Sequence, residues 1–158
     1  MKKMISRKAS VVDQTTKGID FLMEKNKVTV FNGLGSFKDT STIHVEGEKP
    51  EDITAKNIII ATGSKPGSLP FINIDKDRII TSTEALELRE IPKHMIVVGG
   101  GVIGLELGQV YKRLGTEVSV IEYSDRITPV MDSALSRELI KVMKKQKIKF
   151  YLTHQVNK

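Results

Sequence analysis

The chain of 158 residues contains no cysteine and no tryptophan. Without cysteine, its own residues cannot form a disulfide, a thiolate zinc site or a redox-active thiol pair. No apolar run approaches the ~20 residues that a membrane-spanning helix needs, so we expect no membrane insertion. The longest apolar stretches, residues 58–61 and 95–98, have the length of strands instead.

Aromatic residues are also few, with three Tyr and five Phe, although the net charge is +6. The basic residues are scattered along the chain rather than interleaved with aromatics, which argues against nucleic-acid binding. The three histidines, His44, His94 and His154, are not at metal-ligand spacing, so we predict no metal site. The proportions of apolar and charged residues, 39% and 28%, are typical of a globular protein.

The sequence has two parts with different patterns of expected secondary structure, and the boundary between them lies near residues 90–92. The first part is irregular and rich in short β-branched runs and turn residues. We expect it to contain a helix over 11–26, a short strand after Asn26, two or three antiparallel strands within 35–54, a buried strand over 58–61 and a short helix over 82–88.

The second part alternates strands and helices, as does half of a doubly wound parallel sheet. An apolar stripe on its last helix should face the sheet. The expected elements are a strand over 95–98, a helix over 102–114, a strand over 117–122, a helix over 133–146 and a strand from Lys149; the stripe consists of Leu135, Leu139, Val142 and Met143.

Gly99, Gly101 and Gly104 form a G-x-G-x-x-G pattern between an apolar strand and an amphipathic helix. The first glycine permits the sharp turn, the second lets a pyrophosphate approach the backbone, and the third lets the helix pack closely on the strand. Unpaired N–H groups and the dipole at the helix N-terminus favour the anion. A purely structural turn is the alternative, but strand, glycines and helix together indicate a dinucleotide site.

Glu122 ends the next strand, about where the ribose-binding acid of such a fold belongs. A carboxylate there accepts hydrogen bonds from the ribose hydroxyls and repels a 2′-phosphate, which predicts NAD rather than NADP. Arg126, four residues later, complicates this prediction without reversing it. The alternative is an ordinary surface glutamate.

A second cluster, Thr62-Gly63-Ser64, follows the apolar run over 58–61. By composition it is a buried strand that ends in a Thr-Gly turn, and taken alone it favours a structural role. Turns at the carboxyl ends of parallel strands are nevertheless where ligands bind in open α/β sheets.

Taken in order, these motifs resemble the flavoprotein disulfide reductases and, among them, most closely the dihydrolipoamide dehydrogenases. The stretches that carry the resemblance are 33–37, 60–66, 69–70, 82–86 and 98–108. The resemblance implies an α/β fold that binds FAD and NAD. Residues 1–90 would be the C-terminal part of an FAD-binding domain, with a small antiparallel β insertion and a linker. Residues 91–158 would be the N-terminal half of a Rossmann-like, doubly wound NAD-binding domain.

The resemblance also implies which residues bind each cofactor. Ile103 and Glu106 would face the region where flavin meets nicotinamide, although a plain exposed helix residue is the alternative for Glu106. The implied FAD contacts are Gly35, Thr62, Gly63 and Ser64, and the implied NAD contacts are Gly99, Gly100, Gly101, Val102, Ile103, Gly104, Leu105, Glu106 and Glu122.

The activity implied for the parent enzyme is oxidation of protein-bound dihydrolipoyl groups by NAD, through FAD and a redox disulfide. Its partners would be a second copy, in a homodimer, and the lipoyl-bearing subunits of 2-oxo acid dehydrogenase complexes. The parent would lie in the mitochondrial matrix of a eukaryote or the cytoplasm of a bacterium. Alternatives are another reductase of this kind, such as a mercuric reductase or an NADH oxidase, and a non-catalytic NAD-binding module.

The chain departs from the family pattern in three respects. The family's first FAD fingerprint, its redox-active cysteine pair, and its C-terminal dimerisation domain with the His–Glu acid–base pair have no counterpart in this sequence. We therefore expect an internal fragment that is inactive by itself and contains no catalytic residue. A first G-x-G-x-x-G and a Cys-x4-Cys are expected upstream of Met1 in the parent.

Overall fold

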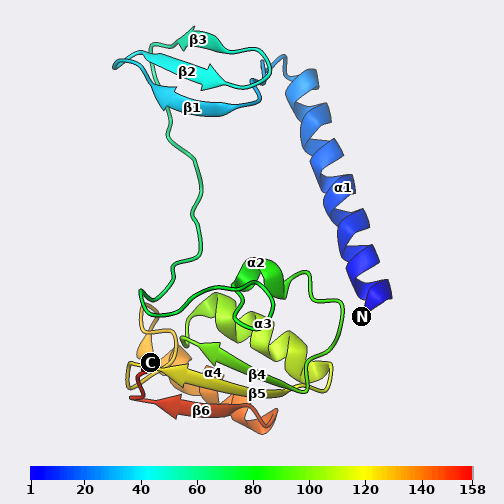
Figure 1. Cartoon of the computed structure of the whole chain (residues 1–158), viewed down its shortest axis with the longest axis vertical. Helices are drawn as coiled ribbons and strands as arrows, with labels where there is room; N and C mark the ends of the chain where they lie inside the picture. Colours follow the sequence, from blue (N-terminus) through cyan, green and yellow to red (C-terminus); the bar gives the residue numbers. More distant parts are fainter. Residues whose placement is uncertain (158) are drawn as a thin grey trace. The chain divides into compact units, whose positions relative to one another are not determined.

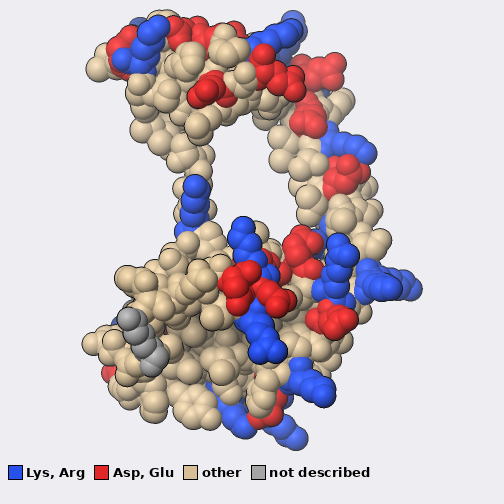
Figure 2. Space-filling view, viewed as in Figure 1, with Lys and Arg blue, Asp and Glu red and all other residues tan. Residues whose placement is uncertain are grey.

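The computed structural model describes residues 1–157 (Figure 1). Its contacts divide the chain into two compact units. The first, called the N-terminal unit below, comprises residues 6–65, and the second, the C-terminal unit, comprises residues 66–158 together with 1–5. No described helix is long and apolar enough to cross a membrane. Acidic and basic side chains are interspersed on the face seen in Figure 2.

The N-terminal unit contains most of helix α1 (Lys2–Lys25) and an antiparallel sheet. The sheet has the order β1 (Leu34–Phe37), β2 (Thr42–Glu46) and β3 (Glu51–Thr54). The expected antiparallel strands are therefore present as a three-stranded meander. Val45 on the central strand is buried, whereas most of the unit's other apolar side chains are exposed.

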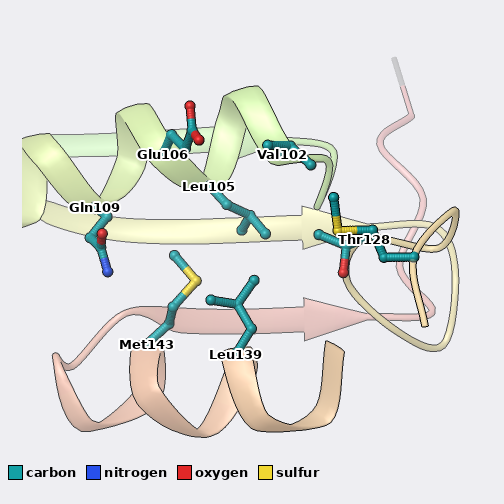
Figure 3. A pocket seen from close by; sticks show the side chains of 8 residues that line it. Val102, Leu105, Glu106, Gln109, Thr128, Leu139 and Met143 are labelled. Carbon is teal, nitrogen blue, oxygen red and sulfur yellow. The ribbon is translucent and has the colours of Figure 1, made fainter. Parts of the chain in front are cut away.

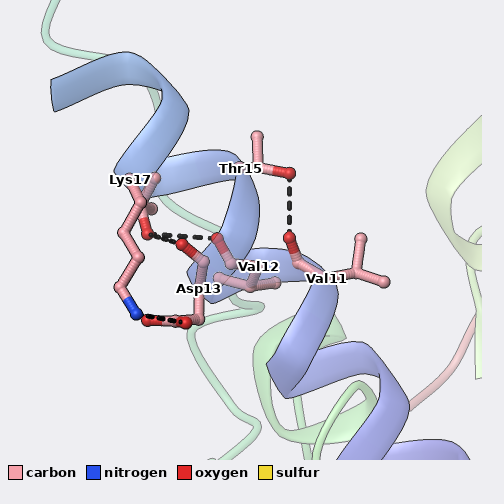
Figure 4. A network of polar contacts seen from close by, with 6 residues as sticks. Val11, Val12, Asp13, Thr15 and Lys17 are labelled. Carbon is pink, nitrogen blue, oxygen red and sulfur yellow. Dashed lines mark hydrogen bonds and ion pairs between the residues drawn. The ribbon is translucent and has the colours of Figure 1, made fainter. Parts of the chain in front are cut away.

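Helix α1 begins at Lys2 rather than near Val11, so its predicted start is wrong. Residues 2–10 lack an apolar period, but they include Lys, Met, Arg and Ala and contain neither Gly nor Pro, so helix propensity is favourable. The polar contacts within the helix are local (Figure 4): Lys17 pairs with Asp13 at 2.8 Å, and the Thr15 hydroxyl donates to the Val11 carbonyl.

Two expected strands are wrong. The run after Asn26 and the run over 58–61 form no strand, and Ile59 and Ile60 are 90% and 70% exposed. A strand requires a neighbouring strand with which its backbone N–H and C=O groups can form hydrogen bonds. Neither run is paired in the two sheets that the described residues form.

The C-terminal unit contains the predicted half of a doubly wound sheet. Parallel strands β4 (His94–Val98), β5 (Glu117–Glu122) and β6 (Lys149–Leu152) lie in that order. Helices α3 (Val102–Arg113) and α4 (Ser133–Lys145) form the two crossovers. The α/β fold expected for this half is thereby confirmed.

One face of this sheet carries the core. Val118 and Val120 on β5 are fully buried and belong to one cluster with Leu105 of α3 and Met143 of α4. Successive residues of a strand point to opposite faces of the sheet. On β4, Ile96 and Val98 point away from this core and are 64% and 52% exposed. Both helices therefore pack on the same side of the sheet.

The stripe predicted on α4 is partly wrong. Met143 is buried and Leu139 packs against the core, but Leu135 and Val142 are exposed. The covered positions follow the spacing i, i+3, i+4, i+7, because the helix turns a slightly different face to the sheet. That face consists of Ser136, Leu139, Ile140 and Met143.

A short helix, α2 (Ser82–Ala85), precedes β4 and ends three residues before the expected Leu88. Its capping box is complete: Thr81 accepts from the Thr83 N–H, and Glu84 accepts from the Thr81 N–H at 2.8 Å. The hydroxyl of Tyr111 on α3 donates to the Ala85 carbonyl and so connects α2 to α3.

Candidate dinucleotide-binding site

The glycine-rich turn lies between the carboxyl end of β4 and the start of α3. Gly99 has a φ of +103°, in the region that favours glycine, and its N–H donates to the Ile121 carbonyl at 2.8 Å. Gly101 is the N-cap of α3 and has no side-chain capping bond. A Cβ placed on Gly99 or Gly101 would meet nothing within 4 Å. The outer side of the turn is therefore open to a ligand.

Gly104 has the opposite surroundings. A Cβ at this position would lie 2.7 Å from Cγ1 of Val97 and 3.1 Å from the Gly99 carbonyl oxygen. Gly108, one turn later, is also close to Val97. Helix α3 therefore packs directly on β4, which agrees with the packing role expected of the third glycine.

Glu122 is nearly enclosed, with 8% of its surface exposed. Its Oε2 accepts from the Gly100 N–H at 2.5 Å, and its Oε1 accepts from the Ser124 N–H at 2.7 Å. The carboxylate thus joins the glycine-rich turn to the loop after β5. An ordinary surface glutamate does not fit this arrangement.

The surroundings of Glu122 lower its pKa. Burial pushes the pKa upward, but hydrogen bonds from the Ser124 and Gly100 N–H groups outweigh it and hold the value below the ordinary 4.5. A carboxyl whose pKa is depressed in the folded state stabilises that state above its unfolded pKa. This contribution is lost as the pH falls through the lower, folded pKa.

We therefore expect the C-terminal unit to lose stability below pH 4.5, in part through Glu122. Thermal unfolding of the wild type and of Glu122→Gln at a series of pH values isolates that part, because the amide has a similar shape and does not titrate in this range. The difference in unfolding temperature should shrink as the pH falls. A difference independent of pH would show that Glu122 titrates normally.

The loop after β5 approaches the turn from the other side. The Thr128 N–H donates to the Gly100 carbonyl at 2.8 Å, and Thr128 and Ser136 are both buried. No sequence pattern marks this pair, because its two hydroxyls meet only through tertiary packing. Arg126 is exposed and donates to the Pro129 carbonyl within its own loop.

A cavity of about 220 Å³ lies between α3 and α4 (Figure 3). In that view Leu105, Leu139 and Met143 point into the space between the helices. Ile103 and Glu106 are both exposed on α3. A contact with a nicotinamide stays a prediction for both. The complete lining is Val102, Leu105, Glu106, Gln109, Thr128, Met131, Leu139 and Met143.

The residues expected to bind FAD lie in the N-terminal unit. Gly35 is on β1 opposite Val45, and Thr62, Gly63 and Ser64 follow in a segment without helix or strand. All four are exposed, and Gly63 has a φ of +71°. Their role as FAD contacts stays a prediction.

Residues 2–158 match the family model described as pyridine nucleotide-disulphide oxidoreductase. The dihydrolipoyl dehydrogenase of Trypanosoma brucei brucei is 46% identical over 145 residues, which cover 90% of this chain and 30% of the relative. Dihydrolipoyl dehydrogenase 3 of Pseudomonas putida is 46% identical over 156 residues, covering 98% of this chain and 34% of the relative.

Solved structures agree with this fold. The Cu(II) complex of a mutant of RclA, a HOCl-induced flavoprotein disulfide reductase from Escherichia coli, matches with a TM-score of 0.84 and 25% identity, covering 98% of this chain and 36% of the other. LpdA from Mycobacterium tuberculosis matches with a TM-score of 0.85 and 24% identity, covering 96% and 35%.

The chain spans about a third of the length of these relatives. The family model nevertheless covers nearly all of the chain, and the expected resemblance to flavoprotein disulfide reductases is confirmed. The chain belongs to the pyridine nucleotide-disulphide oxidoreductases, a family whose cofactors are FAD and NAD(H).

Proposed function

We propose that this chain binds NAD(H) at the glycine-rich turn and belongs to a dihydrolipoamide dehydrogenase. The observation that carries the proposal is the turn itself. Gly99 and Gly101 leave its outer side open directly in front of the first N–H groups of α3. These N–H groups would hold the pyrophosphate, and Glu122 would accept the ribose hydroxyls.

In the parent enzyme, bound NAD would supply the hydride acceptor for oxidation of a protein-bound dihydrolipoyl group. This chain would contribute orientation of the dinucleotide through the turn and selection of NAD through Glu122. The names and identities of the relatives support this parent activity. On the same ground we propose a homodimeric parent that serves 2-oxo acid dehydrogenase complexes, in the mitochondrial matrix of a eukaryote or the cytoplasm of a bacterium.

A second candidate is a non-catalytic NAD-binding module. It is favoured by one observation: the chain has no cysteine. The visible absorption spectrum of the purified chain tests the second candidate. Flavin retained by the chain would exclude a pure NAD-binding module.

We expect the purified chain to bind NADH more tightly than NADPH, since the Glu122 carboxylate repels a 2′-phosphate. We also expect no NADH formation from dihydrolipoamide and NAD, because electron transfer through a disulfide needs two thiols and the chain has none. Fluorescence titration with each dinucleotide tests the first expectation, and an absorbance assay tests the second. Equal affinity for NADH and NADPH would contradict the proposed selection of NAD by Glu122, and measurable turnover would contradict the expected inactivity of the chain.

A further inference from the structure

Both backbone polar groups of Gly100 are hydrogen-bonded. Its N–H donates to Oε2 of Glu122, and its carbonyl accepts from the Thr128 N–H at 2.8 Å. Gly100 is buried, and a Cβ there would lie 3.1 Å from Glu122 Oε2 and 3.2 Å from Cγ2 of Ile127. The orientation of the Gly100–Gly101 peptide, which contains this carbonyl, therefore depends on where the loop after β5 places the Thr128 N–H.

Thr128 adopts an unusual conformation for its residue type. Its φ is +45°, in the left-handed region, where a β-branched residue is strained. Only 2% of its surface is exposed. A strained conformation persists only where the surroundings enforce it, so some contact must hold Thr128 in place.

Ser136 supplies one such contact, beside the backbone hydrogen bonds of Thr128 to Gly100 and Met131. Its Oγ lies 2.7 Å from Oγ1 of Thr128 and 3.1 Å from the carbonyl oxygen of Asp132, and 3% of the residue is exposed. When the Thr128 hydroxyl donates to Ser136 Oγ, the Ser136 hydroxyl is free to donate to the Asp132 carbonyl. Each of the two hydroxyl protons then has a hydrogen-bond acceptor. Asp132 is the N-cap of α4. The two hydroxyls thus connect Thr128 to the start of α4.

The orientation of the Gly100 carbonyl fixes that of the next N–H. The chain has no cis peptide bond among its described residues, and in a trans peptide C=O and N–H point in opposite directions. With the Gly100 carbonyl directed at Thr128, the Gly101 N–H points to the other side of the turn. A Cβ at Gly101 meets nothing within 4 Å, so the space beside this residue is open.

We propose that Thr128, held by Ser136, is a positioning residue that orients the Gly100–Gly101 peptide for the pyrophosphate of NAD(H). This inference rests on the proposed dinucleotide site. Thr128 itself need not contact the ligand, because it acts through the backbone of the turn. The pair links the geometry of the phosphate-binding turn to helix α4.

The test compares Ser136→Ala, Thr128→Gly and the double variant in the full chain. Alanine preserves the helix but removes the partner hydroxyl, so Thr128 can relax to an ordinary φ and withdraw its N–H from Gly100. We expect NADH affinity to fall about three- to tenfold, the loss of one hydrogen bond. Glycine adopts the positive φ without strain, so NADH affinity should fall less in the double variant than in Ser136→Ala.

Thr116→Val is the matched control. Thr116 is fully buried, and its hydroxyl donates to the Pro92 carbonyl at 2.8 Å, at the end of the sheet far from the turn. This variant should lose thermal stability but bind NADH with unchanged affinity. Rescue by Thr128→Gly is a result that a purely structural role for Ser136 does not predict.

A measurement without ligand accompanies the titrations. In Ser136→Ala, the Thr128 amide should exchange its hydrogen faster than in the wild type, because its bond to Gly100 is weakened. Unchanged exchange at Thr128, or equal NADH affinity in the wild type and all three variants, would overturn the positioning role and leave the proposed function standing. If the wild type binds no NADH, the proposed function fails, and this inference fails with it.

Discussion

Replacing Glu122 with alanine should weaken NADH binding by about tenfold to a hundredfold. A charge-assisted hydrogen bond contributes roughly 1.5–3 kcal/mol, and each 1.4 kcal/mol is about one decade in affinity. The structure adds a second cause, because the variant leaves the buried Gly100 N–H without the acceptor it has at 2.5 Å. Fluorescence titration with NADH, compared with thermal unfolding of the same sample, measures both effects.

Glu122→Gln separates the charge from the shape of this side chain. Its amide retains one acceptor oxygen for the turn but no longer repels a 2′-phosphate. We expect both variants to bind NADPH relatively better than the wild type does. An unchanged ratio of NADH to NADPH affinity in both variants would contradict the ribose assignment, and Glu122 would then only connect the turn to the loop after β5.

Gly104→Ala should destabilise the C-terminal unit by about 1–3 kcal/mol, the usual cost of overpacking a filled site. The new methyl group would lie 2.7 Å from Cγ1 of Val97 and 3.1 Å from the Gly99 carbonyl oxygen. Val97 is β-branched and has little rotamer freedom to move away, so α3 must shift from β4. The turn shifts with it, and NADH affinity should fall together with the unfolding temperature.

Gly101→Ala is the control for this prediction. Gly101 has a φ of −76°, which alanine adopts freely, and its Cβ would meet open space. Gly101 is the N-cap of α3, where alanine is less favourable than glycine, so stability should fall, but by less than in Gly104→Ala. NADH binding should weaken because the methyl group occupies the approach of the pyrophosphate. Equal losses of stability in the two variants would show that the close packing at Gly104 has no special importance.

The sequence predicts the C-terminal unit well, because its signals are local. Each crossover joins neighbouring strands, so the apolar run before Gly99 and the helix after it already describe a complete motif. The run over 58–61 has the composition of a strand but forms none, because strand pairing depends on a partner far away in the sequence. The early start of α1 was missed because helix propensity, without apolar periodicity, is a weak signal.

The candidate site divides in the same way. Gly99, Gly101 and Gly104 could be recognised from spacing and context, and so could the position of Glu122. The two backbone hydrogen bonds to the Glu122 carboxylate and the contact between Thr128 and Ser136 could not be predicted. They depend on the path of the loop between β5 and α4, which no periodic pattern determines.

The strand order β4-β5-β6 is also the order of synthesis on the ribosome. Each new strand adds to the edge of one that has already emerged, and each pairing closes a loop of only one helix, so the entropic cost of each step is modest. The Gly99 N–H gains its partner Ile121 when β5 arrives. The hydrogen bond from the Thr128 N–H to the Gly100 carbonyl is secured only when α4 has formed, because Ser136, which holds Thr128, lies on α4. A nascent chain that ends between β5 and α4 therefore has the turn but not yet its final geometry.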